Sequence, residues 1–156
     1  MAVVTLVEVA PQLVIGKEKR GTYSQIPEVI GELAGYALEN GVELVGAPIA
    51  IMHETSEEEA KEADRVGNAL IDIAVPVAGA CAGTELVRCY ELPGGTMARI
   101  VHHGPYAAIG PTYIELFKWI QKNGKQIVGP LREVYLNDPG VVPSEEIVTE
   151  IYAPVS

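Results

Sequence analysis

The sequence of 156 residues contains no apolar run near the ~20 residues that a membrane-spanning helix needs. Its first residues, 1–8, lack the basic start and apolar core of a signal peptide. Only two cysteines are present, Cys81 and Cys89, and they form neither a disulfide framework nor a metal-ligand spacing. These absences predict a cytoplasmic protein whose two thiols are reduced.

Positive charge is also scarce, because 11 Lys and Arg residues face 21 Asp and Glu residues, for a net charge of −10. No Lys/Arg stripe reverses this average locally, so direct binding to the phosphate backbone of a nucleic acid is not expected. The three histidines have no Asp, Glu or Cys at a recognised ligand spacing, and no Gly-x-Ser-x-Gly elbow or phosphate loop is present. We therefore expect no metal and no cofactor, while an acidic protein can attract cationic ligands.

The chain repeats one pattern twice. Gly21 and Gly104 are 83 residues apart, and this offset aligns other residues in one register. The aligned residues are Glu8 with Glu91, Tyr23 with Tyr106, Ile26 with Ile109, Leu33 with Leu116, Asn40-Gly41 with Asn123-Gly124, and Val45-Gly46 with Val128-Gly129. At a shorter offset of 78, Asp72-Ile73 aligns with Glu150-Ile151 and Pro76-Val77 with Pro154-Val155. We predict two halves, about 1–77 and 85–156, joined by a small flexible connector at about 78–84.

Each half reads as strand–helix–strand–strand. Helices are predicted over about 27–39 and 111–122, where Pro27 suits a first turn and Asn40-Gly41 a C-terminal stop. The acidic segment 54–65 is predicted to be a solvated loop with a helical turn. Strands are predicted over 3–17 (broken at Ala10-Pro11), 44–53, 69–77, 85–103 (broken at Pro93-Gly94-Gly95), 130–136 and 147–155. The fold class is α+β, with the two halves sharing a core about a pseudo-twofold axis and a ligand groove at their seam.

Glu133 stands in the middle of the predicted strand 130–136, with Leu131 and Tyr135 on the same face. An unpaired buried charge costs several kcal/mol, so carboxylates are rare at such positions. The other repeat has Ala50 at the equivalent position, which leaves space opposite the charge. Glu133 is interpreted as the counter-ion of a cationic ligand or as a general base; a partner for Arg132 or Arg99, or an exposed edge position, is the alternative.

Aromatic side chains recur at equivalent positions of the two halves. Trp119 on the second helix aligns with Tyr36 on the first, and the pair could sandwich a flat ligand, although both also lie beside the apolar stripes of their helices. Met52 aligns with Tyr135 and would provide an adaptable apolar wall. Ordinary core packing remains the alternative for each aromatic residue. The candidate ligand-binding residues are Glu133, Tyr135, Trp119, Tyr106, Tyr36, Tyr23, Met52 and Ala50.

The order and spacing of several short motifs resemble the GyrI-like (gyrase-inhibitor-like) small-molecule-binding domain. These motifs are Glu91-Leu92-Pro93-Gly94-Gly95, His103-Gly104-Pro105-Tyr106, Trp119-Ile120, Gly129-Pro130, Glu133-Val134-Tyr135, Asn137-Asp138-Pro139, Thr149-Glu150-Ile151 and Pro154-Val155. This family is the effector-binding domain of multidrug-sensing MerR- and AraC-type regulators, and it also occurs as stand-alone proteins. The resemblance implies a groove that binds lipophilic, often cationic and aromatic molecules, with a glutamate at its base at the position of Glu133.

The sequence shows no helix-turn-helix segment, so the resemblance implies a stand-alone member that does not itself contact DNA, with a separate regulator or other protein as a conceivable partner. The first hypothesis is a cytoplasmic binding protein for lipophilic, aromatic and cationic small molecules. The second, which the resemblance also implies, is a hydrolase of strained cyclopropane-containing genotoxins, with Glu133 as the base and Trp119 and Tyr135 holding the substrate. The third is an acidic protein-interaction or gyrase-inhibitor-like module.

Overall fold

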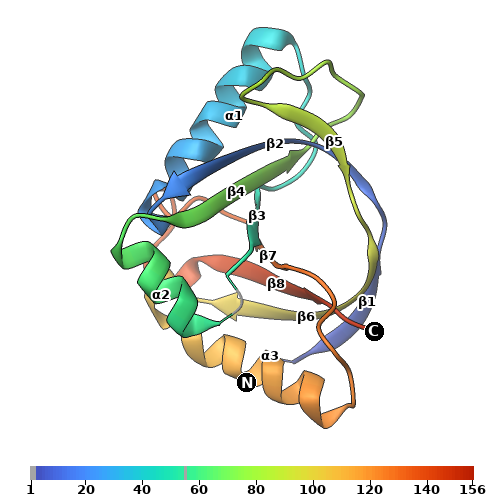
Figure 1. The fold of residues 1–156 in the computed structure, drawn as a ribbon, viewed down its shortest axis with the longest axis vertical. Coiled ribbons are helices and arrows are strands. Elements are labelled where there is room, and N and C mark those ends of the chain that lie inside the picture. The colour runs from blue at the N-terminus through green and yellow to red at the C-terminus, as the bar shows by residue number, and fades with distance from the viewer. Residues whose placement is uncertain (1–2, 55) are drawn as a thin grey trace. The chain divides into compact units, whose positions relative to one another are not determined.

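The computed structural model describes residues 3–54 and 56–156, and the chain forms two compact units. We call Pro11–Pro93 the first unit, and Met1–Ala10 together with Gly94–Ser156 the second unit. Among the described residues, no helix is both long and apolar enough to cross a membrane. Figure 1 shows the elements of both units with the labels used below.

The second unit is an antiparallel sheet with one helix on a face, and its strands follow the order β1-β6-β8-β7. Helix α3 packs on β6 and buries Leu116 and Ile120 in an apolar core that includes Ile100 and Ile151. The elements are β1 (Thr5–Val9), β6 (Gly95–His103), α3 (Gly110–Lys122), β7 (Leu131–Tyr135) and β8 (Val148–Pro154), with short 3-10 helices at Tyr106–Ala108 and Ser144–Glu146.

The first unit has the same plan, with its strands in the order β3-β4-β2-β5. Helix α1 lies against β2 and β4 and buries Val29, Leu33 and Ala37. The elements are β2 (Gln12–Gly21), α1 (Ile26–Asn40), β3 (Ile49–Met52), α2 (Glu57–Arg65), β4 (Ala69–Pro76) and β5 (Arg88–Leu92), with a 3-10 helix at Tyr23–Gln25.

The predicted repeat of strand–helix–strand–strand is confirmed element by element, since β2, α1, β3 and β4 correspond to β6, α3, β7 and β8. The compact units nevertheless differ from the sequence halves in one strand each. β1 precedes the first repeat but pairs with β6, whereas β5 precedes the second repeat but pairs with β2. The breaks at Pro11 and Pro93, where no ladder donor is available, separate each of these strands from the strand that follows it.

The helix boundaries follow from local chemistry. Pro27 occupies the first turn of α1, and Gly41 ends the helix in the left-handed conformation with φ 65° while its N–H donates to the carbonyl of Ala37. The prediction of a loop over 54–65 is wrong for most of its length, because Glu57–Arg65 forms α2. The side chain of Ser56 accepts the N–H of Glu59 and caps this helix, while Thr55 lies outside the described residues.

The prediction that both cysteines are reduced thiols is wrong in this structure, because Cys81 and Cys89 form a disulfide. The segment after β4 turns back on itself through a turn in which the N–H of Thr84 donates to the carbonyl of Val87, at 2.6 Å. This turn places Cys81 beside β5, and the two Cα atoms lie 5.8 Å apart. A single pair of cysteines carries no spacing pattern, so its pairing depends on the path of the chain between them.

Candidate functional site

Glu133 lies on β7, on the face of the second unit that α3 covers. It stands opposite Ile151 of β8, and Ile151 belongs to the apolar core beneath α3. Leu131, two residues earlier on the same face, packs against that core. Only 8% of Glu133 is exposed. The carboxylate is therefore placed at the border of an apolar core, where its ionised form has lost most of its water.

Two tyrosine hydroxyls hold this carboxylate, one on each oxygen. Tyr113, from the start of α3, donates to Oε2, and Tyr135, two residues further on β7, donates to Oε1 at 2.9 Å. Within the described part of the chain, no Lys, Arg or His forms an ion pair with Glu133. The alternative that Arg99 neutralises it is wrong, because Arg99 pairs with Glu150. Glu133 is thus a buried anion whose hydrogen-bond partners are neutral.

Further aromatic rings extend this arrangement. Tyr106, from the 3-10 helix after β6, meets the ring of Tyr135 edge to face at a centroid distance of 5.6 Å. Phe117, which is 43% exposed, lies 5.9 Å from the ring of Tyr113. We call Glu133, Tyr113, Tyr135 and Tyr106 the glutamate–tyrosine cluster.

The pKa values of two tyrosines in this cluster, Tyr135 and Tyr106, are raised. Burial, and then the charge of Glu133, raise the pKa of Tyr135 well above its ordinary 10.0. Burial also raises the pKa of Tyr106, with a further contribution from Glu133. At neutral pH Tyr135 is therefore neutral, and it acts as a hydrogen-bond donor to the carboxylate rather than as a second negative charge.

The structure brings Tyr135 and Tyr106 to Glu133, as their spacing along the strand and repeat suggested, and it adds Tyr113. Tyr113 was not among the candidate ligand-binding residues, because a tyrosine on the apolar stripe of a helix is usually part of the core. The signal that could have identified it is its position three residues before Leu116, on the stripe of α3 that faces the sheet. Trp119 lies further along α3, half-buried against the apolar core cluster.

The other candidate residues belong to the first unit, where the environment differs. Ala50, equivalent to Glu133, is 2% exposed and packs opposite Ile73 without any charge. Tyr23, equivalent to Tyr106, donates its hydroxyl to Glu54. Met52 is half-buried at the end of β3, and Tyr36 is half-buried on α1. The first unit therefore has no counterpart of the glutamate–tyrosine cluster.

A second buried carboxylate, Asp72 on β4, was not among the candidates, although the repeat aligned it with Glu150. Only 5% of Asp72 is exposed, and its Oδ2 lies 2.7 Å from Nε2 of His53. A guanidinium nitrogen of Arg88 lies 3.9 Å from its Oδ1. Burial raises the pKa of Asp72, and the contact with His53 opposes this rise. Asp72 thus has a guanidinium and an imidazole as neighbours, whereas both hydrogen-bond partners of Glu133 are tyrosine hydroxyls.

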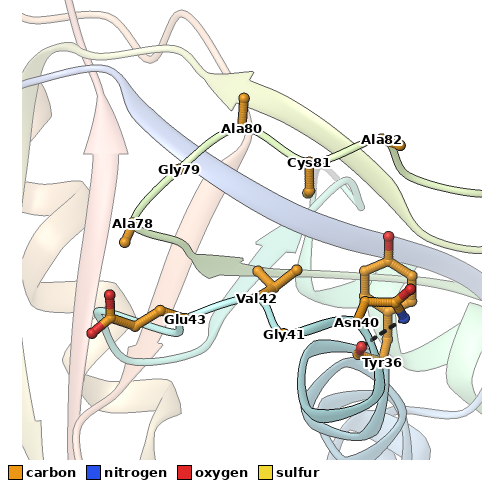
Figure 2. A pocket seen from close by; sticks show the side chains of 10 residues that line it. All are labelled: Tyr36, Asn40, Gly41, Val42, Glu43, Ala78, Gly79, Ala80, Cys81 and Ala82. Atoms are coloured by element: carbon orange, nitrogen blue, oxygen red, sulfur yellow. Dashed lines mark hydrogen bonds between the residues drawn. The ribbon is translucent and has the colours of Figure 1, made fainter.

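The first unit also contains a surface pocket of about 530 Å³. It lies between the C-terminal end of α1 with the segment that follows and the segment 78–82, which leads from β4 toward β5 (Figure 2). Its lining residues are Tyr36, Asn40, Gly41, Val42, Glu43, Ala78, Gly79, Ala80, Cys81 and Ala82.

A duplicated strand–helix–strand–strand chain with a buried carboxylate among aromatic side chains has the features of a small-molecule-binding domain. The family of GyrI-like small molecule binding domains matches residues 3–156, and the chain belongs to this family. The family resemblance drawn from the sequence motifs is therefore confirmed.

Solved structures show the same fold at low sequence identity. The crystal structure of the EcmrR C-terminal domain is 20% identical, with a TM-score of 0.86 over 100% of this chain and 98% of that chain. In an EcmrR–DNA complex, this chain spans only 57% of the EcmrR chain it matches. A hydrolase from Listeria innocua is 14% identical, with a TM-score of 0.72 over 98% of this chain and 91% of that chain. SAV2435 bound to tetraphenylphosphonium is 15% identical, with a TM-score of 0.56 over 99% and 94%. No curated protein sequence matches this chain.

Proposed function

We propose that this GyrI-like domain is a cytoplasmic protein that binds lipophilic, aromatic cations, with Glu133 as the counter-ion. The observation that carries the proposal is a carboxylate that is 8% exposed, is held by two neutral hydroxyls and has no cationic partner in the described chain. Such an anion gains more from an arriving cation than a solvated one does, because little water has to be stripped from it.

The aromatic neighbours fit the same class of ligand. The rings of Tyr135 and Tyr106 offer faces and edges to an aromatic body and attract a cation through their π-electrons. That SAV2435 was solved with tetraphenylphosphonium, a lipophilic aromatic cation, supports the choice of this class and supplies a probe. Trp119 is proposed as a further contact, and Tyr36, Tyr23, Met52 and Ala50 stay predictions from the sequence.

The geometry implies a competition for the carboxylate. Tyr113 occupies Oε2 of Glu133 from α3, so a cation that approaches this oxygen has to displace the hydroxyl. Replacing Tyr113 with phenylalanine removes the competing donor and leaves the buried oxygen unsatisfied in the empty protein. Both effects favour the bound state. Tyr113→Phe should therefore bind a cation more tightly than the wild-type protein, whereas Glu133→Gln should bind it more weakly.

Calorimetric titration with tetraphenylphosphonium tests this pair of opposite effects. We expect Glu133→Gln to lower the affinity at least about tenfold, the equivalent of 1.4 kcal/mol. The matched control is Glu150→Gln, which removes the same charge from the same unit and leaves the glutamate–tyrosine cluster intact. Neutral triphenylphosphine oxide should not distinguish Glu133→Gln from the wild type. Equal affinity of wild type and Glu133→Gln for the phosphonium ion would reject Glu133 as the counter-ion.

Hydrolysis of a strained electrophile is the second candidate, because a buried carboxylate beside two phenols could act as a base, and a hydrolase shares the fold. We rank it lower, because both carboxylate oxygens of Glu133 already accept a tyrosine hydroxyl, which leaves less room for a water molecule to be activated there. Turnover of cyclopropane-containing electrophiles by the wild type, with loss of product in Glu133→Gln, would reverse this ranking.

A further inference from the structure

The pocket at the end of α1 belongs to the first unit, whereas every residue of the glutamate–tyrosine cluster belongs to the second. Its volume of about 530 Å³ falls within the ~300–1,000 Å³ of small-molecule sites. The end of α1 and residues 42–43 form one wall, and the segment 78–82 forms the other (Figure 2). The proposed function does not use this pocket, so its chemistry is a separate question.

The pocket is electronegative. The C-terminal end of a helix carries a partial negative charge, and α1 has no basic residue in its last turn. Glu43, an exposed residue, is part of the lining, and no ion pair to it is formed among the described residues. None of the ten lining residues is Lys, Arg or His. A cation entering the pocket therefore meets no competing positive charge from its walls.

The side chains that line the pocket place an aromatic ring and a carboxylate at different ends of it. Figure 2 shows the ring of Tyr36 at one end and Glu43 at the other, with Val42 between them. Across from them runs the segment 78–82, whose residues are small and carry no charge. This arrangement suits an elongated molecule with an aromatic end against Tyr36 and a charged amine toward Glu43.

The second repeat shows that the fold does not require this charge. At the offset of 83 residues, Lys122 stands where Glu39 is, Lys125 where Val42 is, and Gln126 where Glu43 is. The corresponding end of α3 thus carries two cations and no carboxylate at these positions, while Trp119 keeps an aromatic ring at the place of Tyr36. Both helices pack on their sheets although only the end of α1 is negatively charged. The packing therefore does not require this charge, and the charge is available for a ligand.

The wall opposite α1 is held in place at both ends. The N–H of Ala78 donates to the carbonyl of Glu43 at 3.0 Å and joins the two walls directly at this point. Further along, Cys81 is tied by the disulfide to Cys89, which pairs with Ile15 of β2. Fixing a wall before the ligand arrives lowers the entropy that binding would otherwise cost.

We infer that this pocket is a second ligand site, distinct from Glu133, that takes a small primary ammonium ion with an aromatic end. Glu43 and the end of α1 meet the charge, and Tyr36 meets the ring. The inference does not rest on the proposed function, because this pocket shares no residue with the glutamate–tyrosine cluster.

Titration of the full ¹⁵N-labelled chain with 2-phenylethylammonium, followed by amide chemical shifts, tests this inference. The shifts should concentrate at Gly41, Val42 and Ala80, with saturation behaviour. Glu43→Gln, which installs the residue of the other repeat, should lower the affinity about two- to fivefold, the range of exposed ion pairs. Glu58→Gln, an exposed carboxylate on α2 outside the pocket, is the matched control and should leave the affinity unchanged.

Two further arms identify the ligand chemistry and the site. The neutral analogue 2-phenylethanol should bind the wild type more weakly than the ammonium ion does. Its affinity should be the same for the wild type and for Glu43→Gln. Glu133→Gln should leave the saturation of the shifts at Gly41, Val42 and Ala80 unchanged, whatever happens to shifts near Tyr135, which separates this site from the proposed function. Shifts centred on Tyr135 instead of Gly41, or equal ammonium affinities of wild type and Glu43→Gln, would overturn the inference.

Discussion

Replacing Cys81 and Cys89 together with serine should lower the free energy of unfolding, because the disulfide restricts the unfolded chain. The two cysteines are separated by 8 residues. For a loop of that size, the chain-entropy relation gives about 8 cal/mol/K, or about 2.5 kcal/mol at 25 °C. Both side chains are half-buried rather than part of the core, so the substitution itself removes little apolar contact. Loop closure is therefore expected to dominate the difference.

Urea unfolding of three samples measures this effect: the oxidised wild type, the wild type with a reductant, and the double serine variant. The last two should unfold at nearly the same urea concentration, below that of the oxidised wild type. In a thermal scan the loss corresponds to about 5–10 °C in Tm for a chain of this size. Adding the reductant to the serine variant, which has no thiol left to respond, is the control.

Identical midpoints for the oxidised and reduced wild type would refute this reasoning. A thiol titration in denaturant is the independent check, since a formed disulfide leaves no free thiol and reduced cysteines leave two. The result also bears on the second ligand site, because Cys81 lines that pocket. In a reducing cytoplasm the bond would be open to exchange, and the wall of the pocket would then lose one of its two anchors.

Two further variants probe the core and the buried aspartate. Leu116→Ala should lower the free energy of unfolding by about 2–5 kcal/mol, because the side chain of Leu116 is fully buried between α3 and the sheet. A loss well under about 1 kcal/mol in urea unfolding would contradict this. The free energy of unfolding of Asp72→Asn, relative to that of the wild type, should be higher at pH 7 than near pH 4. Burial raises the pKa of Asp72 in the folded state, so the wild type gains stability as the pH falls and Asp72 takes up a proton, until the pH is below the unfolded value of 3.8. The titratable and charged groups that face Asp72 are Glu18, His53 and Arg88. If the difference in unfolding free energy between the two proteins does not change with pH, the pKa of Asp72 is not raised in the folded state.

The repeat made most of the elements predictable, but it could not predict how they pair. Aligning Glu8 with Glu91 identifies β1 and β5 as equivalent strands. The alignment says nothing about which unit each strand joins, and in the structure each joins the sheet of the other repeat. Strand pairing between distant segments depends on contacts that a local pattern does not contain. The disulfide escaped prediction for the same reason.

Some features were missed although a local signal existed. The acidic run Glu57-Glu58-Glu59 was read as a solvated loop, yet Ser56 followed three residues later by Glu59 is a capping signature, and Ser56 caps α2. Tyr113 also carried a local signal, its place on the stripe of α3 that faces the sheet, but a tyrosine at such a position is usually part of the core. Its role appears only when β7 brings Glu133 within reach of its hydroxyl.

The two repeats provide an internal reference for what the fold requires. Gly41 and Gly124 have φ values of 65° and 66°, and both stand at equivalent helix ends, so this residue is kept because the backbone needs it. Glu133 and Ala50 show the opposite case. Ala50 packs at 2% exposure in the same place on its sheet, so the position can be filled without a charge. A buried carboxylate costs several kcal/mol relative to an apolar residue, and two tyrosine hydroxyls offset only part of that cost. Since the fold does not need this charge, we propose that a ligand compensates the remaining cost when it binds beside Glu133.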